Sequence, residues 1–294
     1  MAVKDIRTAL SPVGGMKVQT TKLADNIQSM TTSVGLLQQT VTAVQSGDAL
    51  VRQKLGPILT QSVVPLLRMG QSAETVLSVV AGDIRQFIGD VQTITKAVES
   101  DADTPAEAVL QIYLAAMANE ANMVQSSAKQ ASTLLTSYKN TADQAEAALN
   151  TYSQTLIQQD KKLAQEAANL RQQMHDMTSG NCCKQIGHAF QMAFGHLKRD
   201  LEEKSREIRQ LEYVVAINEE AVSGLTQMVQ RLADISSVAS ALQVSWESVS
   251  VNVSGLGSDL ATVLKDTTRA ELQGDLAYVN SDWQAILATL NKIT

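Results

Sequence analysis

The sequence is poor in the residues that build β-sheets and their turns. Aromatic residues make up 3% of the 294 positions and there are four prolines, although 44% of the residues are hydrophobic. An all-β protein of this length would need many more aromatic and turn-forming residues, whereas alanine, leucine, glutamine and lysine favour helices. The composition therefore predicts an all-α protein.

Several other classes of protein are excluded by what the chain lacks. Cysteine occurs only at the adjacent positions Cys182 and Cys183, so no disulfide framework identifies an oxidising compartment. The net charge is −6 and the basic residues form no block, which argues against binding to nucleic acid. No window reaches the roughly 18 uninterrupted apolar residues of a transmembrane helix, and the first twenty residues lack the apolar core of a Sec signal peptide. We therefore expect a protein that is made in soluble form.

The acidic residues give no sign of catalysis. An active site needs a nucleophile with a base, or a pair of carboxylates in a pocket. Here the acids are spread along helix faces, as in RDLEEKSREIRQLE at residues 199–212, which is most simply an ion-paired and solvated surface. There is no glycine-rich phosphate loop, and Gly255–Gly257 is interpreted as a hinge between helices. We expect neither enzymatic activity nor a cofactor.

Two long helical segments dominate the chain. Thr104 is a candidate cap, Pro105 suits the first helical position, and neither glycine nor proline follows before residue 179. An unbroken helix over this span would be roughly 110 Å long. Its apolar residues recur at alternating spacings of three and four, and the same period resumes after Lys198 and continues to Val249. Because the linker is short, the two helices must pack antiparallel.

The remaining segments are shorter. A loose leader ends at Gly14 and Gly15, and apolar spacing predicts a helix from about Leu23 to Val44. A turn at residues 45–48 precedes another helical segment, and Pro65 suits the first turn of a helix that extends to about residue 98. A last helix is expected over residues 272–290, and the tryptophans are expected in the core. The fold class is therefore an elongated bundle of four to six long antiparallel helices with a small hydrophobic head at one tip.

The segment between the two long helices, GNCCKQIGHAFQMAFGHLK at residues 180–198, contains two of the three phenylalanines. Read as a helix, it places an apolar face at a bundle tip, where there is little core to bury it. A helix over residues 185–197 spans only about 20 Å, so one copy could enter a lipid leaflet but hardly cross it. The candidate contact residues are Cys182, Cys183, Ile186, Ala189, Phe190, Met192, Ala193, Phe194 and Leu197, and the candidate hinges are Gly180, Gly187 and Gly195.

Other interpretations of this head stay open. It can be a cap packed against its own bundle or against a symmetry mate, because an apolar stripe is usually core. All three histidines and both cysteines lie between His175 and His196, which suggests zinc or a protonation-linked switch. Adjacent cysteines lack the usual spacing of structural zinc pairs, so we expect no metal site.

The pattern resembles the cytolysin A type of α-helical pore-forming toxins, a group that includes haemolysin BL and related tripartite and binary bacterial toxins. The likeness is carried by two long antiparallel helices that meet at a glycine-containing apolar head, by the shorter N-terminal helices, and by the C-terminal helix with YVNSDWQAILATL at residues 278–290. It implies a first part of the bundle at residues 1–179, a head at 180–197 and a return part at 198–294. The head is shorter than that of the single-component toxins. In this respect the chain is similar to a small-headed component of a multi-component system.

This resemblance also implies a function. The protein would be secreted in soluble form without a Sec signal peptide, bind a target-cell lipid membrane through its head, and form a homo-oligomer with other toxin components as a pore that lyses the cell. The competing class is a non-toxic coiled-coil scaffold or signalling rod, whose apolar tip would contact another protein. Dependence on lipid separates the two.

Overall fold

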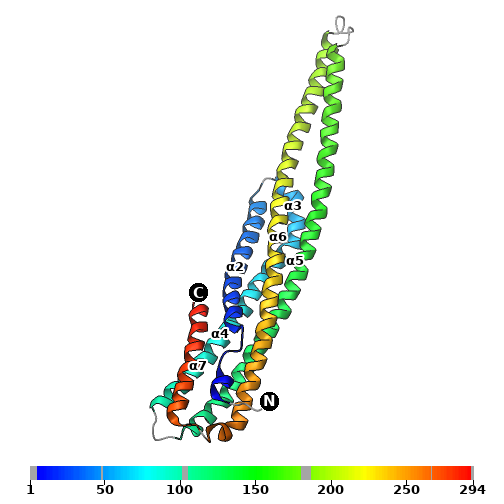
Figure 1. Ribbon diagram of the computed structural model, residues 1–294. Helices are drawn as coiled ribbons and strands as arrows, with labels where there is room; N and C mark the ends of the chain where they lie inside the picture. Colours follow the sequence, from blue (N-terminus) through cyan, green and yellow to red (C-terminus); the bar gives the residue numbers. More distant parts are fainter. Residues whose placement is uncertain (1–4, 48, 101–104, 180–186, 266, 293–294) are drawn as a thin grey trace. The chain divides into compact units, whose positions relative to one another are not determined.

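The computed structural model describes residues 5–47, 49–100, 105–179, 187–265 and 267–292, with side chains from Gln191 onward in the segment that begins at residue 187. All regular secondary structure in these residues is helical, which confirms the all-α prediction. Six of the helices have 14 residues or more. In chain order the helices of the described residues are α1 (Ile6–Leu10), α2 (Met16–Ser46), α3 (Ala49–Ser62), α4 (Val64–Ser100), α5 (Ala106–Ser179), α6 (Gly187–Leu264) and α7 (Arg269–Leu290), as Figure 1 shows.

The helices form two compact units, each built from separate stretches of the chain. The first unit comprises Met1–Val34, Arg68–Asn140 and Met228–Thr294, and the second comprises Gly35–Leu67 and Thr141–Gln227. The 74 residues of α5 and the 78 of α6 are therefore shared between the two units.

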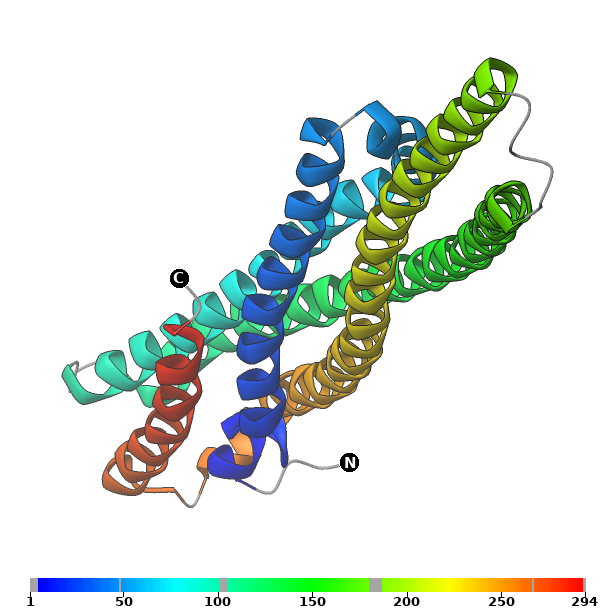
Figure 2. The same cartoon turned by 90° about the horizontal axis from the view of Figure 1, so that it is seen from above.

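The core of the first unit contains an aromatic cluster. Phe87 of α4 lies 5.0 Å, between ring centroids, from both Trp246 of α6 and Trp283 of α7, and the two indoles are 5.6 Å apart. All three side chains are fully buried, so the predicted core position of the tryptophans is confirmed. Trp283 Nε1 donates a hydrogen bond of 2.7 Å to the carbonyl oxygen of Leu10, which ties α1 to α7. Figure 2 shows these two helices beside each other.

The second unit has an aliphatic core between the end of α2, α3 and the adjoining parts of α5 and α6. Leucine, valine and alanine side chains fill it, as the low aromatic content predicts. Among the hydrogen bonds that link its helices, Tyr152 Oη of α5 donates to the carbonyl oxygen of Lys54 at 2.8 Å, and the buried Asn218 Nδ2 of α6 donates to that of Leu149 at 3.1 Å. Buried polar groups with partners of this kind fix the register between neighbouring helices.

Most predicted helix boundaries are confirmed. The helix α2 ends at Ser46 and α3 begins at Ala49, in agreement with a break near the turn predicted at residues 45–48, and Pro65 is the second residue of α4. Proline is tolerated in the first turn because a backbone N–H there would have no intrahelical acceptor, so its absence breaks no hydrogen bond. Pro105 directly precedes α5, whose first turn carries Glu107 near the positive end of the helix dipole. The proposed cap Thr104 lies outside the described residues.

The predicted hinge at Gly255–Gly257 is wrong, because α6 continues through it to Leu264. A glycine inside a helix costs only about 1 kcal/mol relative to alanine. The side chains of Val253, Leu256 and Leu260 are fully buried here, so tertiary packing holds the helix together across its glycines. The break comes later, where Thr268 and Glu271 form a reciprocal capping box that starts α7.

The prediction of a loose N-terminal leader is also wrong in part. Residues 6–10 form α1, and Asp5 caps it by accepting a hydrogen bond of 2.6 Å from the backbone N–H of Thr8. Ile6 and Leu10 are 1% exposed, so this short helix belongs to the core. A helix of five residues is too short to be stable alone, and its contacts with α7 therefore stabilise it.

Candidate functional site

Within each unit, α5 and α6 pack antiparallel, as predicted. In the second unit Glu146 accepts a hydrogen bond from Thr226, and Glu166 forms an ion pair with Lys204. Residues later in α5 therefore face residues earlier in α6. The same register holds in the first unit, where Ser132 lies against Ser240 and Thr136 against Ser236. In the second unit this arrangement brings the end of α5 close to the start of α6, on either side of the predicted head.

The last part of this helix pair has a thin core. A hydrogen bond of 3.3 Å from Lys54 Nζ to Gln159 Oε1 links α3 to α5. Beyond it, Ala167 is the only fully buried side chain among residues 157–179 and 191–210. The apolar seam there is half-buried and consists of Leu163, Leu170, Met174, Met177, Phe194, Leu197, Leu201 and Ile208.

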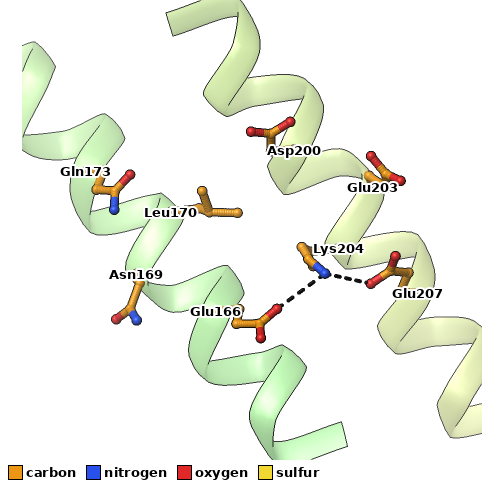
Figure 3. A pocket seen from close by; sticks show the side chains of 8 residues that line it. All are labelled: Glu166, Asn169, Leu170, Gln173, Asp200, Glu203, Lys204 and Glu207. Carbon is orange, nitrogen blue, oxygen red and sulfur yellow. Dashed lines mark hydrogen bonds and ion pairs between the residues drawn. The ribbon is translucent and has the colours of Figure 1, made fainter. Parts of the chain in front are cut away.

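A polar hollow interrupts the seam. Figure 3 shows it between α5 and α6, with Lys204 pointing toward Glu166 across the gap and toward Glu207 on its own helix. The Nζ distances are 3.2 Å to Glu166 Oε2 and 3.0 Å to Glu207 Oε2. Hydrogen bonds to Glu207 and Glu166 raise the pKa of Lys204, so the ammonium stays charged in neutral solution. Asp200 and Glu203 also line the hollow, which therefore has four carboxylates around one cation.

The predicted head residues are partly described. Cys182, Cys183, Ile186 and Gly180 lie outside the described residues. Gly187, Ala189 and Phe190 belong to the first turn of α6, but their side chains are not among those described. Where side chains are described, two kinds of position occur. Met192 is 60% exposed and Ala193 is exposed, whereas Phe194 and Leu197 are half-buried as part of the seam.

Gly195, a predicted hinge, lies inside α6 rather than at a break, and a methyl group placed on it would meet no atom within 4 Å. Of the histidines, His175 is exposed and His196 Nδ1 lies 3.2 Å from the guanidinium of Arg199. Within the described residues, no three His, Cys, Asp or Glu side chains are arranged to hold a metal ion. In the same residues no helix combines the length and the apolar content needed to span a bilayer.

Sequence reasoning did not identify Lys204 as special, because it placed residues 199–212 on a solvated surface. The ion pairs of Lys204 agree with that interpretation, but its position does not: it follows Leu197 and Leu201 and precedes Ile208 at seam spacing. The sequence could have identified Lys204 because a lysine at an apolar position of a heptad pattern is unusual.

No protein-family model and no curated protein sequence matches this chain. Solved structures do match in fold. The SmhB pore of the tripartite α-pore-forming toxin Smh from Serratia marcescens has a TM-score of 0.71 at 8% identity, over 94% of this chain and 97% of that one. The pre-pore AhlB of the tripartite toxin AHL from Aeromonas hydrophila has a TM-score of 0.66 at 11% identity, over 94% and 98%. The HblL1 toxin component of Bacillus cereus has a TM-score of 0.59 at 12% identity, over 97% of each chain.

At such low identities the likeness concerns the fold. The chain has the fold of components of tripartite α-pore-forming toxins, and the resemblance predicted from the sequence is confirmed at this level. The match extends over almost the whole length of both partners in each comparison.

Proposed function

We propose that this chain is a soluble component of an α-helical pore-forming toxin. It binds a target-cell membrane through the head at residues 182–197 and assembles with further copies and with other components into a pore that lyses the cell. The observation that carries the proposal is the end-to-end likeness in fold to toxin components, one of which is the subunit of a pore. Binding and assembly of this kind need burial of apolar surface rather than a catalytic residue.

The first contact with lipid is assigned to apolar side chains that are already exposed. Met192 is 60% exposed near the start of α6, next to the exposed Ala193. Full burial of one such side chain stabilises the bound state by about 1.5 to 3 kcal/mol, which is weak for a monomer. Several copies in one oligomer bind together much more firmly, because each further contact becomes intramolecular.

Deeper insertion requires the helix pair to open. Phe194 and Leu197 are half-buried in the seam, so they reach lipid only after leaving it. Opening the helix pair loses little packing free energy, because in its described part the seam beyond Gln159 contains a single fully buried side chain, Ala167. Lipid can therefore replace the helix–helix contact as the partner of these side chains.

The experiment is flotation of the purified protein with phosphatidylcholine liposomes that contain an entrapped dye. Met192→Asp is the test variant, because its side chain is exposed and its replacement leaves the seam intact. Met123→Asp is the matched control, since this methionine of α5 is 53% exposed. We expect flotation to fall about tenfold or more for Met192→Asp and to be unchanged for Met123→Asp.

Dye release in the same tubes separates two roles. Release by the wild type identifies a component that forms pores alone, and flotation without release identifies one that needs other components. If the wild-type protein does not float, or if Met192→Asp floats equally well, the proposed membrane-binding role of the head is contradicted and the coiled-coil scaffold is favoured.

A further inference from the structure

A second hollow lies in the first unit, away from the residues assigned to the head. It is formed where α1 and the loop after it meet α6 and α7. Arg7, Ser11, Asn252, Tyr278 and Asp282 line it together with the loop residues 12–14. The side chains come from residues 7–14 near the start of the chain and from α6 and α7 near its end. The hollow therefore exists only in the folded unit.

An arginine and a tyrosine form one wall of this hollow. The guanidinium carbon of Arg7 lies 3.2 Å from the centroid of the Tyr278 ring, a cation–π contact. Among the described residues Arg7 has no ion pair and its side chain makes no hydrogen bond. A guanidinium held over a ring in this way keeps its N–H donors for another partner. Tyr278 is 44% exposed, so part of its ring stays open to solvent.

Three other polar side chains of the hollow also lack partners in the described part of the chain, whereas Thr8, which lines it too, donates a hydrogen bond to Asp5 Oδ2 at 3.0 Å. Ser11 Oγ is buried and has no hydrogen-bond partner there. Asn252 and Asp282 are half-buried, and no side-chain hydrogen bond or ion pair involves either. Burial of the Ser11 hydroxyl without a partner is unfavourable, which is a cost to the folded unit. A ligand that supplied donors and acceptors to these side chains would be stabilised by removing that cost.

The charges select the kind of ligand. Asp282 disfavours a phosphate or a carboxylate, and Arg7 disfavours an amine, because each would place like charges together. A neutral ring with several hydroxyl groups suits both, since each hydroxyl both donates and accepts. We propose that this hollow binds a saccharide unit. Arg7 and Asn252 donate to its oxygens, Asp282 accepts from its hydroxyl groups, and the open part of the Tyr278 ring packs against its C–H groups.

A zwitterionic lipid headgroup is the nearest rival, because its positive charge could pair with Asp282 and its negative charge with Arg7. Only the saccharide offers both an array of hydroxyl groups for Ser11, Asn252 and Asp282 and a face of C–H groups for the Tyr278 ring, which is why it is favoured. The saccharide site requires neither the head nor lipid. Its test therefore contains no membrane, and its failure leaves the toxin proposal untouched.

The test is saturation-transfer NMR on the whole protein with the methyl glycosides of glucose, galactose, mannose and N-acetylglucosamine. Asp282→Ala is the test variant. Asp275→Ala, one heptad earlier on α7 and outside the hollow, is the matched control. Trp283 is fully buried beside the site, so its fluorescence checks that each variant is folded. If Asp282→Ala does not fold, Asn252→Ala takes its place.

We expect transfer to at least one glycoside from the wild type and from Asp275→Ala, with a signal at least fivefold weaker from Asp282→Ala. Two results would overturn the proposal: no transfer to any of the four glycosides, or equal transfer by all variants. Displacement of the glycoside by phosphoethanolamine at equal concentration would reassign the hollow to a zwitterionic headgroup and overturn it as well.

Discussion

Lys204 Nζ lies 3.2 Å from Glu166 Oε2 on the facing helix, at a position where the apolar spacing of α6 calls for a hydrophobic side chain. It is the one cation among the residues that line this hollow, which also carry four carboxylates. Because Glu207 and Glu166 raise the pKa of Lys204, its contribution to stability is present in neutral solution and is lost as the pH rises above the ordinary value of 10.5. The contribution also requires both carboxylates to be ionised, so it is lost in acid as well. Lys204 is therefore an electrostatic link between two helices that share little core.

Lys204→Gln should loosen the helix pair, because it leaves the four carboxylates without a counter-charge. We expect faster amide hydrogen exchange over residues 163–173 and 198–208 at low salt. The difference from wild type should shrink in 1 M salt, where the Debye length is only about 3 Å. Lys198→Gln is the control, since this exposed lysine lies outside the hollow. Equal exchange in Lys204→Gln and wild type at low salt would show that the ion pair contributes nothing.

The two tryptophans allow a matched measurement of one hydrogen bond. Trp283 Nε1 donates to Leu10, whereas Trp246 Nε1 is buried and has no partner among the described residues. Replacing either by phenylalanine removes a similar volume, but only Trp283→Phe breaks a hydrogen bond. We expect Trp283→Phe to lose about 1 kcal/mol more of unfolding free energy than Trp246→Phe. Urea titrations followed by far-UV circular dichroism measure this difference, and an equal loss in both would contradict it.

Glu120 makes the stability of the first unit depend on pH. Gln86 Nε2 of α4 donates to its Oε1 at 2.8 Å, and burial together with the neighbouring Asp90 raises the pKa of Glu120 from 4.5 to about 7. Between these two values the folded protein keeps a proton that the unfolded chain releases. Stability therefore falls as the pH rises from 4.5 through 7 and stays lower above that range.

Glu120→Gln should flatten this dependence, because an amide has no proton to lose. Urea midpoints of the variant between pH 5 and pH 8 should change less than those of the wild type. Glu99→Gln, at an exposed position of α4 in the same unit, should keep the wild-type slope. If the urea midpoint of Glu120→Gln changes with pH as much as that of the wild type, the pH dependence arises from other groups.

Much of the fold could be predicted because it depends on local periodicity. The seams of α5 and α6 recur over many turns, and the short linker between them leaves only an antiparallel arrangement. The core positions of Trp246 and Trp283 followed from the apolar spacing of α6 and α7 and are confirmed. These features need no knowledge of distant contacts.

The errors arise where distant contacts decide the local structure. The five residues of α1 carry too little helical signal, and the hydrogen bond from Trp283 to Leu10 crosses most of the sequence. The local sequence at residues 255–257 predicts a break in the helix, but burial of Leu256 keeps the segment helical. The polar hollow required the pairing of Lys204 with Glu166, which lies on another helix. Local sequence does not contain these partners.

The native cysteines make the central claim directly measurable, since Cys182 and Cys183 both belong to the proposed head. A Cys183→Ser variant leaves one thiol, which can carry an environment-sensitive NBD dye. The control is Met123→Cys in a chain in which both native cysteines are serine, because Met123 is exposed on α5. Each labelled protein is mixed with liposomes that contain lipids with a doxyl quencher on the acyl chain.

We expect the dye at Cys182 to shift its emission to shorter wavelength and to be quenched by the acyl-chain label, because it enters the hydrocarbon of the bilayer. The dye at position 123 should remain in water and unquenched. If the liposomes release their contents while the dye at Cys182 stays unquenched, the membrane is permeabilised without the head, and the proposed role of residues 182–197 is contradicted.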